Sequence, residues 1–274
     1  MRRRGVLVAV LITVGVCLVA YPFVAMWLST RAADELISAY EKQVQQTSAV
    51  NLADELERAR AYNAALTGEE VRDPFVAGSG IAYPNNYESV LNLDANGVMG
   101  YLEIPALDLA VPIYHGTSDA VLDKGVGHIP ESALPVGGEG TRCVLAAHRG
   151  RMGRELFTNV DKLKKGDIFL LHVLGETYAY KIVKIEIVEP EQLVDIRPEE
   201  GRDLCTLMTC TPLNINSHRL LLHGERTEYT PDLLAGVPAS HGLSAYEKQL
   251  IAAGLIGAAV IGGVVWIRRR RKRS

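Results

Sequence analysis

One cysteine stands where a reactive thiol would be placed. The apolar run Leu204–Thr209 predicts a strand, and Cys210 ends it directly before Thr211-Pro212. Proline interrupts the hydrogen-bonded ladder of a sheet, so we expect the Cys210 thiol to be exposed at the rim of a barrel. Most single cysteines are buried structural residues, and position alone does not separate that interpretation from a nucleophile.

A histidine has the equivalent position on another predicted strand. The run Cys143–Ala147 is apolar, and His148 ends it before Arg149-Gly150. The nucleophilic form of cysteine is the thiolate, which a neighbouring imidazolium stabilises. A lone histidine on a strand is usually just a satisfied polar residue. Two strands that both end in a reactive side chain and a turn favour a pair of Cys210 and His148.

Arg219 opens the next predicted strand, nine residues after Cys210. If the two strands are neighbours joined by the 212–217 loop, the start of one lies beside the end of the other. A guanidinium there could donate hydrogen bonds to the oxyanion of a tetrahedral intermediate. Without a nearby thiol and imidazole, a surface salt bridge would be the preferred interpretation of Arg219.

A metal site is the alternative use of these side chains. Its candidate ligands are Cys143, Cys205, Cys210, His148 and His218. No pair among them has the short C-x-x-C or H-x-x-x-H spacing of a structural or catalytic zinc site. We therefore expect neither a metal nor another cofactor.

The central part of the chain has the pattern of a mainly β protein. Short apolar and β-branched runs, separated by Gly, Pro and Asp, predict strands at 98–104, 109–114, 141–147, 168–173, 176–188, 204–209 and 219–225. Leu174-Gly175 predicts a hairpin turn. Seven or eight short strands with little helix between them indicate a closed β-barrel.

Both ends of the chain carry an apolar run with a basic outer flank. Gly5–Leu28 holds 24 uncharged residues after Arg2–Arg4, and Gln249–Ile267 holds 19 before the basic run 268–273. Each is long enough to cross a bilayer, and the positive-inside rule then places both termini in the cytoplasm and the middle outside. The alternatives are a signal peptide cleaved near Ala25 and, for the second run, a buried core helix.

The part between the two runs is acidic. Nine of the 29 Lys and Arg residues lie in the flanks, so 20 stand against 32 Asp and Glu, a net charge of about −12. Nucleic acid is not expected as a partner, because phosphate binding needs a basic surface. Three cysteines lie in this part, and an odd number leaves an unpaired thiol in an oxidising compartment.

A helical segment separates the first apolar run from the predicted barrel. Residues 31–67 have helical spacing, broken near Thr47-Ser48, and Gly68 ends the pattern. Asp73-Pro74-Phe75 then lead into a stretch rich in turn residues. A solvated stalk and a regulatory element are both open interpretations of the helices.

The motifs around these side chains resemble those of sortases. The runs Thr206–Pro212 and Asn216–Leu220 are similar to the family's T-L-x-T-C-T-P and N-T-H-R-L signature. Further similar motifs are spread over residues 90–226: Gly127-His128, Leu134–Gly138, Ala147–Gly150, Leu156-Phe157 and Lys162–Asp167. The sequence departs from the family's usual residues at Ala146-Ala147, Leu213 and His223, which bears on substrate details near the cleft and leaves the chemistry intact.

Among sortases, the chain resembles the pilin-joining class C type, which has a C-terminal membrane span and an N-terminal lid with the triplet D-P-F or D-P-W. Here the triplet is Asp73-Pro74-Phe75. The resemblance implies a closed eight-stranded β-barrel with short helices, a helical and lid segment before it, and two transmembrane helices. The expected parts are an N-terminal span (1–30), the helical and lid segment (31–89), the catalytic barrel (90–228), a linker (229–248) and a C-terminal span with a basic tail (249–274).

The resemblance also implies a reaction. Cys210 would attack the Thr–Gly amide of an L-P-x-T-G-like sorting signal, and a lysine of another pilin subunit would resolve the thioacyl enzyme to an isopeptide bond. His148 would transfer protons, and Arg219 would hold the carbonyl oxygen. Asp73 is expected near Cys210 or Arg219, with Phe75 in the substrate groove. The implied partners are pilin subunits and the membrane.

Two further cysteines have related positions. Cys143 precedes His148 by five residues, and Cys205 precedes Cys210 by five. If the two strands are parallel neighbours with His148 and Cys210 level, Cys143 and Cys205 are level too. They then either form a disulfide or pack as small apolar side chains.

Other functions are open beside this one. A housekeeping sortase would attach proteins to the cell-wall peptide and would have no working lid. A catalytically silent membrane scaffold would only bind sorting signals. An L,D-transpeptidase does not fit, because its His shortly precedes its Cys, whereas here 62 positions separate His148 from Cys210.

Overall fold

The computed structural model of the chain describes residues 2–66, 71–75, 86–93, 96–151 and 153–234, with single residues at 251, 254 and 257. The chain divides into two units. One consists of Met1–Ser29, Met152–Arg154 and His241–Ser274, and the other of Thr30–Arg151 and Glu155–Ser240. All the side chains of the candidate site belong to the second unit.

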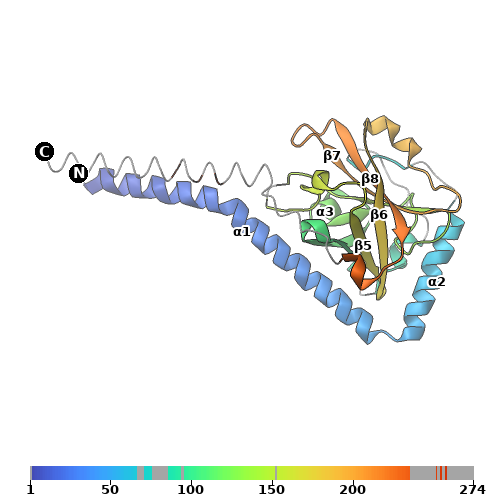
Figure 1. Ribbon diagram of the computed structural model, residues 1–274. Coiled ribbons are helices and arrows are strands. Elements are labelled where there is room, and N and C mark those ends of the chain that lie inside the picture. The colour runs from blue at the N-terminus through green and yellow to red at the C-terminus, as the bar shows by residue number, and fades with distance from the viewer. Residues whose placement is uncertain are drawn as a thin grey trace. The chain divides into compact units, whose positions relative to one another are not determined.

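Eight strands close into a barrel in the order β1-β2-β3-β4-β7-β8-β6-β5. Their bounds are β1 Val98–Ile104, β2 Leu109–His115, β3 Val126–His128, β4 Thr141–Ala146, β5 Ile168–Val173, β6 Glu176–Val188, β7 Asp203–Thr211 and β8 His218–Thr227. Figure 1 shows β5 to β8 side by side in this barrel. The predicted closed barrel is confirmed, but β3 was missed, because three residues around a glycine are too few to show a strand's alternation.

Two strand pairs decide which side chains meet. β4 and β7 are parallel, with Cys143 opposite Cys205 and Ala146 opposite Met208. β7 and β8 are antiparallel, with Cys210 opposite Arg219. The predicted neighbour relations of these strands are therefore confirmed. Cys143 and Cys205 are level as expected, and both are buried free thiols, so they pack and form no disulfide.

Alternation along these strands separates an inner from an outer apolar layer. Cys143, Leu145, Cys205, Leu207 and Leu222 belong to the large cluster inside the barrel. The residues between them belong to a smaller apolar cluster on the outer face: Val144, Ala146, Met208 and Leu221. Since Cys210 follows Met208 by two residues, it lies on the outer face of β7.

Two long helices precede the barrel. They are α1 (Arg2–Gln46) and α2 (Ala49–Ala65), and the Ser48 side chain caps α2 by accepting a hydrogen bond from the Asn51 N–H at 3.2 Å. The break thus falls where the sequence predicts it. Among the described residues, one helix is long and apolar enough to span a membrane, Leu11–Gln46 with a mean hydropathy of 2.1. The predicted C-terminal span, 249–274, lies outside the described residues apart from three single positions.

The helices near the barrel are packed against it. Ala59 and Tyr62 of α2 belong to the inner apolar cluster, and Asn63 bonds both the N–H and the C=O of Leu134, at 2.7 and 3.2 Å. The solvated stalk is therefore the wrong interpretation of α2, because its apolar face completes the core. The remaining helical pieces are short: η1 Tyr87–Ser89, η2 Pro105–Leu107, α3 Asp119–Leu122, η3 Val160–Lys162, η4 Pro190–Asp195 and η5 Pro231–Leu234.

Candidate active site

The thiol of Cys210 is buried at the end of β7. Only 6% of the residue is exposed, so the expected exposure at the barrel rim is wrong. The reason is tertiary: β8 and the segment Val71–Phe75 bring Arg219 and Asp73 close to it. The pKa of the Cys210 thiol is raised to about 11: burial has the largest effect and raises it, the Arg219 guanidinium lowers it, and the Asp73 carboxylate raises it.

The guanidinium of Arg219 is buried beside Cys210. The two residues are register partners of β8 and β7, and Arg219 is 4% exposed. Its Nη1 donates to the carbonyl oxygens of Asn216 and His218, each at 3.0 Å. These bonds hold the guanidinium against the 212–217 loop, so two of its nitrogens remain to bind an oxygen near the thiol.

Those nitrogens bind the carboxylate of Asp73. Arg219 Nε lies 3.0 and 2.9 Å from the two Asp73 oxygens, and Nη2 lies 2.6 Å from Oδ2. Asp73 is 8% exposed and also accepts a hydrogen bond from the Phe75 N–H at 3.0 Å. A buried, multiply bonded ion pair thus closes the outer face of the barrel at the thiol.

The Phe75 ring lies against the His148 ring and the Arg219 guanidinium. Its centroid is 5.7 Å from the His148 ring and 5.3 Å from Arg219 Cζ. Phe75 and Val71 pack on the outer apolar cluster, which also contains Leu193 and Ile196 of the segment between β6 and β7. The segment Val71–Phe75, with Pro74 between Asp73 and Phe75, therefore occupies an apolar surface that runs up to Cys210.

His148 lies two residues after the end of β4, the strand that pairs with β7. The Ala147 N–H donates to Met208 O at 3.2 Å, which extends the parallel pairing to the residue before it. Burial lowers the pKa of His148, as does the charge of Arg151, while Asp123 and Asp119 raise it. The structure thus brings Cys210, His148 and Arg219 to one end of the barrel, with Asp73 and Phe75 between them.

Of the other candidate metal ligands, His218 lies at this end, opposite Thr211, but the two remaining cysteines do not. Cys143 and Cys205 lie in the inner cluster, whereas Cys210 is on the outer face. Among the residues that the structure describes, no three His, Cys, Asp or Glu side chains are grouped to hold a metal ion.

Sequence reasoning missed two polar residues near the site, Arg149 and Asp123, and a third, Arg142, that supports the outer face farther along β4. Arg149 donates to Thr211 Oγ1 at 3.1 Å and pairs with Asp161 at 2.6 Å, which ties the chain after β4 to the end of β7. Asp123 pairs with His148, and Arg142 supports the outer face. Arg149 lies inside a motif that the sequence singled out, but no local pattern marks the other two.

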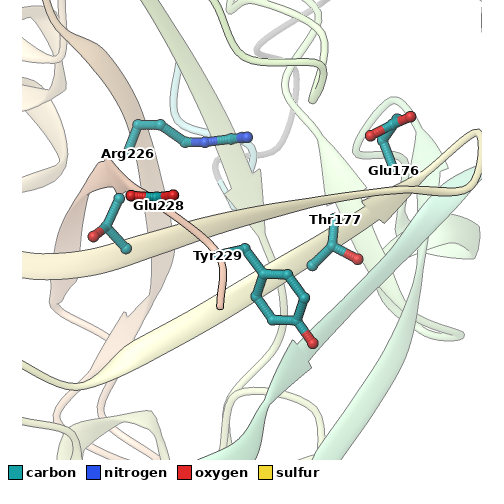
Figure 2. A pocket seen from close by; sticks show the side chains of 6 residues that line it. Glu176, Thr177, Arg226, Glu228 and Tyr229 are labelled. Carbon is teal, nitrogen blue, oxygen red and sulfur yellow. The ribbon is translucent and has the colours of Figure 1, made fainter. Parts of the chain in front are cut away.

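A separate hollow of about 570 Å³ lies at the far end of β8 (Figure 2). It is lined by Glu176, Thr177, Arg226, Thr227, Glu228 and Tyr229. Arg226 is seven residues from Arg219 along the same strand, a distance of about 23 Å. Its lining holds none of Cys210, His148 and Arg219, so it is separate from the candidate site.

A thiol beside a guanidinium, with an imidazole at the end of the adjoining strand, is a set of side chains typical of cysteine enzymes that act on acyl groups. The family comparisons agree. A model described as "Sortase domain" matches residues 102–227. The chain is 32% identical to Sortase SrtE2 of Streptomyces coelicolor over 179 residues, 58% of this chain and 68% of that one. It is 32% identical to Sortase D of Bacillus subtilis over 130 residues, and there it spans 63% of the relative.

Solved structures show the same relation. Sortase C of Streptococcus pneumoniae is 43% identical, with a TM-score of 0.66 over 72% of this chain and 98% of that chain. Sortase C1 of Streptococcus agalactiae is 39% identical, with a TM-score of 0.66 over 72% and 97%. The chain belongs to the sortase family of cysteine transpeptidases, and its structural neighbours are sortases of class C.

Proposed function

We propose that this chain joins pilin subunits by sortase chemistry. The Cys210 sulfur attacks the Thr carbonyl of an L-P-x-T-G-like signal, the Thr–Gly C–N bond breaks, and the Gly amine leaves with a proton from His148. A lysine amine of a second subunit then attacks the thioester, gives a proton to His148, and expels the Cys210 thiolate. The observation that carries this proposal is the set of Cys210, Arg219 and Asp73 at one end of the barrel, with His148 beside it.

In this mechanism the guanidinium of Arg219 binds two groups in turn, first the Asp73 carboxylate and then the substrate carbonyl oxygen. In the closed state it binds the Asp73 carboxylate at 2.6 to 3.0 Å. When Asp73 leaves, the same two nitrogens face the position next to Cys210, where the carbonyl oxygen of the substrate gains negative charge. Donors whose positions are fixed in advance stabilise such an oxyanion most effectively. Here the bonds from Arg219 Nη1 to two backbone carbonyls fix the guanidinium and therefore the other two nitrogens.

The protonation states of the closed site are those of a resting enzyme. The pKa of Cys210 is raised to about 11 and that of His148 is lowered, so at neutral pH the thiol and the imidazole are both uncharged. The reactive thiolate and imidazolium form together only as a minor pair. Removal of Asp73, which raises the thiol pKa, increases this pair.

The segment Val71–Phe75 supports the pilin reaction over the housekeeping one. It fills the outer apolar surface and neutralises Arg219, as a lid that opens for substrate would. The Streptococcus pneumoniae Sortase C structure is described in terms of catalysis and pilin substrate specificity, which favours pilin subunits as partners here. We also infer two membrane spans, the first part of α1 within residues 1–30 and the segment 249–274, with both termini cytoplasmic and the barrel outside.

The test uses the full chain in detergent with a pilin subunit that ends in an L-P-x-T-G signal. The wild type should give a thioacyl adduct on Cys210 by intact mass and a ladder of covalent subunits on a denaturing gel. The Cys210→Ala variant should give neither, while the Cys17→Ser control, which removes an exposed thiol of the other unit, should retain both. Adducts that pass only to a cell-wall amine would support the housekeeping reaction. Failure to form an adduct even after Asp73→Ala and Phe75→Ala would overturn the proposed function.

A further inference from the structure

A carboxylate outside the three site residues faces the histidine. Asp123 follows α3 directly, and its backbone N–H bonds back to Asp119 O, which places its side chain at the end of that helix. Its Oδ1 atom is shielded from solvent and lies 3.8 Å from His148 Nε2. The same oxygen lies 2.5 Å from Arg151 Nη2. One carboxylate oxygen is thus shared by an imidazole and a guanidinium.

We propose that Asp123 is the positioning carboxylate of His148 and that Arg151 competes with His148 for it. This inference rests on the proposed function, in which His148 must carry a proton to the leaving amine. The chemistry is that of a carboxylate behind an imidazole: it fixes the ring orientation and stabilises the charged form.

The need for such a carboxylate follows from the surroundings of His148. The ring is partly buried, and burial disfavours its charged form. Phe75 covers it with an apolar ring. The charged groups that face it are Asp119 and Asp123 from α3 and Arg151 from the chain after β4. Asp123 is therefore a direct partner that stabilises imidazolium, and Arg151 opposes it.

The present distances fit a resting state. The 3.8 Å contact to His148 is longer than a hydrogen bond, whereas Arg151 is at ion-pair distance. Arg151 is half exposed, with 52% of its side chain accessible, so it is held on one side only. When Arg151 moves away from Asp123, Asp123 Oδ1 can accept a hydrogen bond from His148 Nε2. This bond fixes the orientation of the ring, with the other ring nitrogen pointing away from Asp123. The competing interpretation, a surface salt bridge between Asp123 and Arg151, predicts no effect on His148.

The test compares charge-matched variants of the full chain in detergent. The titration of His148 is followed by NMR of ¹³C-labelled histidine, and single-turnover thioacylation by a sorting-signal peptide is measured against pH with the lid opened by Asp73→Ala and Phe75→Ala. Asp123→Asn should lower the His148 pKa and reduce thioacylation at pH 7 by roughly threefold to tenfold. The peptide concentration that gives half the maximal single-turnover rate should stay constant, since the change acts on proton transfer and not on peptide binding. Asp123→Glu should restore part of the rate.

Two further variants make the comparison decisive. Arg151→Gln should shift the His148 titration the opposite way, upward, and raise the rate. Glu139→Gln removes a carboxylate from an exposed turn and should change neither. If Asp123→Asn leaves the His148 titration where Glu139→Gln leaves it, the proposal is wrong. If the wild type forms no thioacyl adduct, the proposed function fails, and the NMR shift still decides whether Asp123 and His148 are coupled.

Discussion

Cys210 lies between two opposite charges, and their balance sets its reactivity. Asp73 raises the pKa of the thiol, Arg219 lowers it, and burial raises it most. At pH 8, a thiol with a pKa of about 11 is ionised in roughly one molecule in a thousand. The thiol of Cys210 is therefore almost entirely protonated in this structure. In the proposed mechanism this thiol is the nucleophile, and the Asp73 carboxylate is the group that leaves it.

We predict that Asp73→Asn speeds the alkylation of Cys210. Removal of the negative charge lowers the thiol pKa, so more thiolate is present at any pH below it, and the rate with iodoacetamide should rise about threefold to tenfold at pH 8. Arg219→Met should have the opposite effect, since it removes the charge that lowers this pKa. Intact mass against time, from pH 6 to 10 in a Cys17→Ser background, measures both. Equal rates for Asp73→Asn and the parent at every pH would contradict the prediction.

At the scale of elements, the outer apolar surface depends on a buried arginine of β4. Arg142 Nε donates to Arg197 O at 2.6 Å, and Nη2 pairs with Glu199 at 2.7 Å. Its Nη1 donates to Thr206 Oγ1 at 3.0 Å and to His223 Nδ1 at 3.1 Å. Arg142 thus fastens the segment between β6 and β7, which carries Leu193 and Ile196, onto β7 and β8.

We predict that Arg142→Met lowers the free energy of unfolding by about 2 kcal/mol, because it leaves buried acceptors without a donor. Arg202→Met is the matched control: Arg202 also pairs with Glu199, but 37% of its side chain is exposed, so its loss should cost less than about 1 kcal/mol. Denaturant unfolding of the full chain in detergent, followed by circular dichroism of the β-barrel, measures both values. Similar losses for the two variants would show that Arg142 does not hold this segment.

At the scale of the whole catalytic unit, the helices before the barrel are part of its structure. Tyr40 near the end of α1 donates to Met99 O at 3.0 Å and accepts from the Leu174 N–H at 2.9 Å. Its hydroxyl joins β1 to the turn between β5 and β6. Glu41 accepts a further hydrogen bond from Tyr101 at 2.7 Å. The end of α1 is therefore fixed to the barrel wall by side chains that are specific for this contact.

We predict that Tyr40→Phe destabilises the catalytic unit by about 1 to 2 kcal/mol. The change keeps the ring but leaves a buried N–H and a buried C=O without their partner. Hydrogen exchange should become faster around Leu174, and the melting temperature should fall. Tyr229→Phe, at a tyrosine that is 41% exposed, should leave both measurements unchanged. If it lowers the melting temperature as much as Tyr40→Phe does, the loss is not specific to the contact with α1.

The sequence by itself determined the features that neighbouring residues encode. Alternation of apolar residues predicted seven of the eight strands, and the helix break at Thr47-Ser48 followed from local composition. The placement of Cys210 and His148 at the ends of two strands, with Arg219 at the start of a third, was enough to indicate thiol chemistry. These signals extend over a few residues each, which is the range over which backbone periodicity acts.

Only the tertiary structure decided how these side chains are held. Three features depend on residues that are far apart in the chain: the burial of Cys210, the ion pair of Asp73 with Arg219, and the contact of Asp123 with His148. Asp73 and Arg219, for example, are 146 positions apart. The packing of α2 on the barrel is of the same kind. No local pattern encodes such contacts, because they form only when the barrel closes and the segment Val71–Phe75 and α2 pack on it. These tertiary contacts set the burial and the charges around the thiol and the imidazole, and therefore their pKa values.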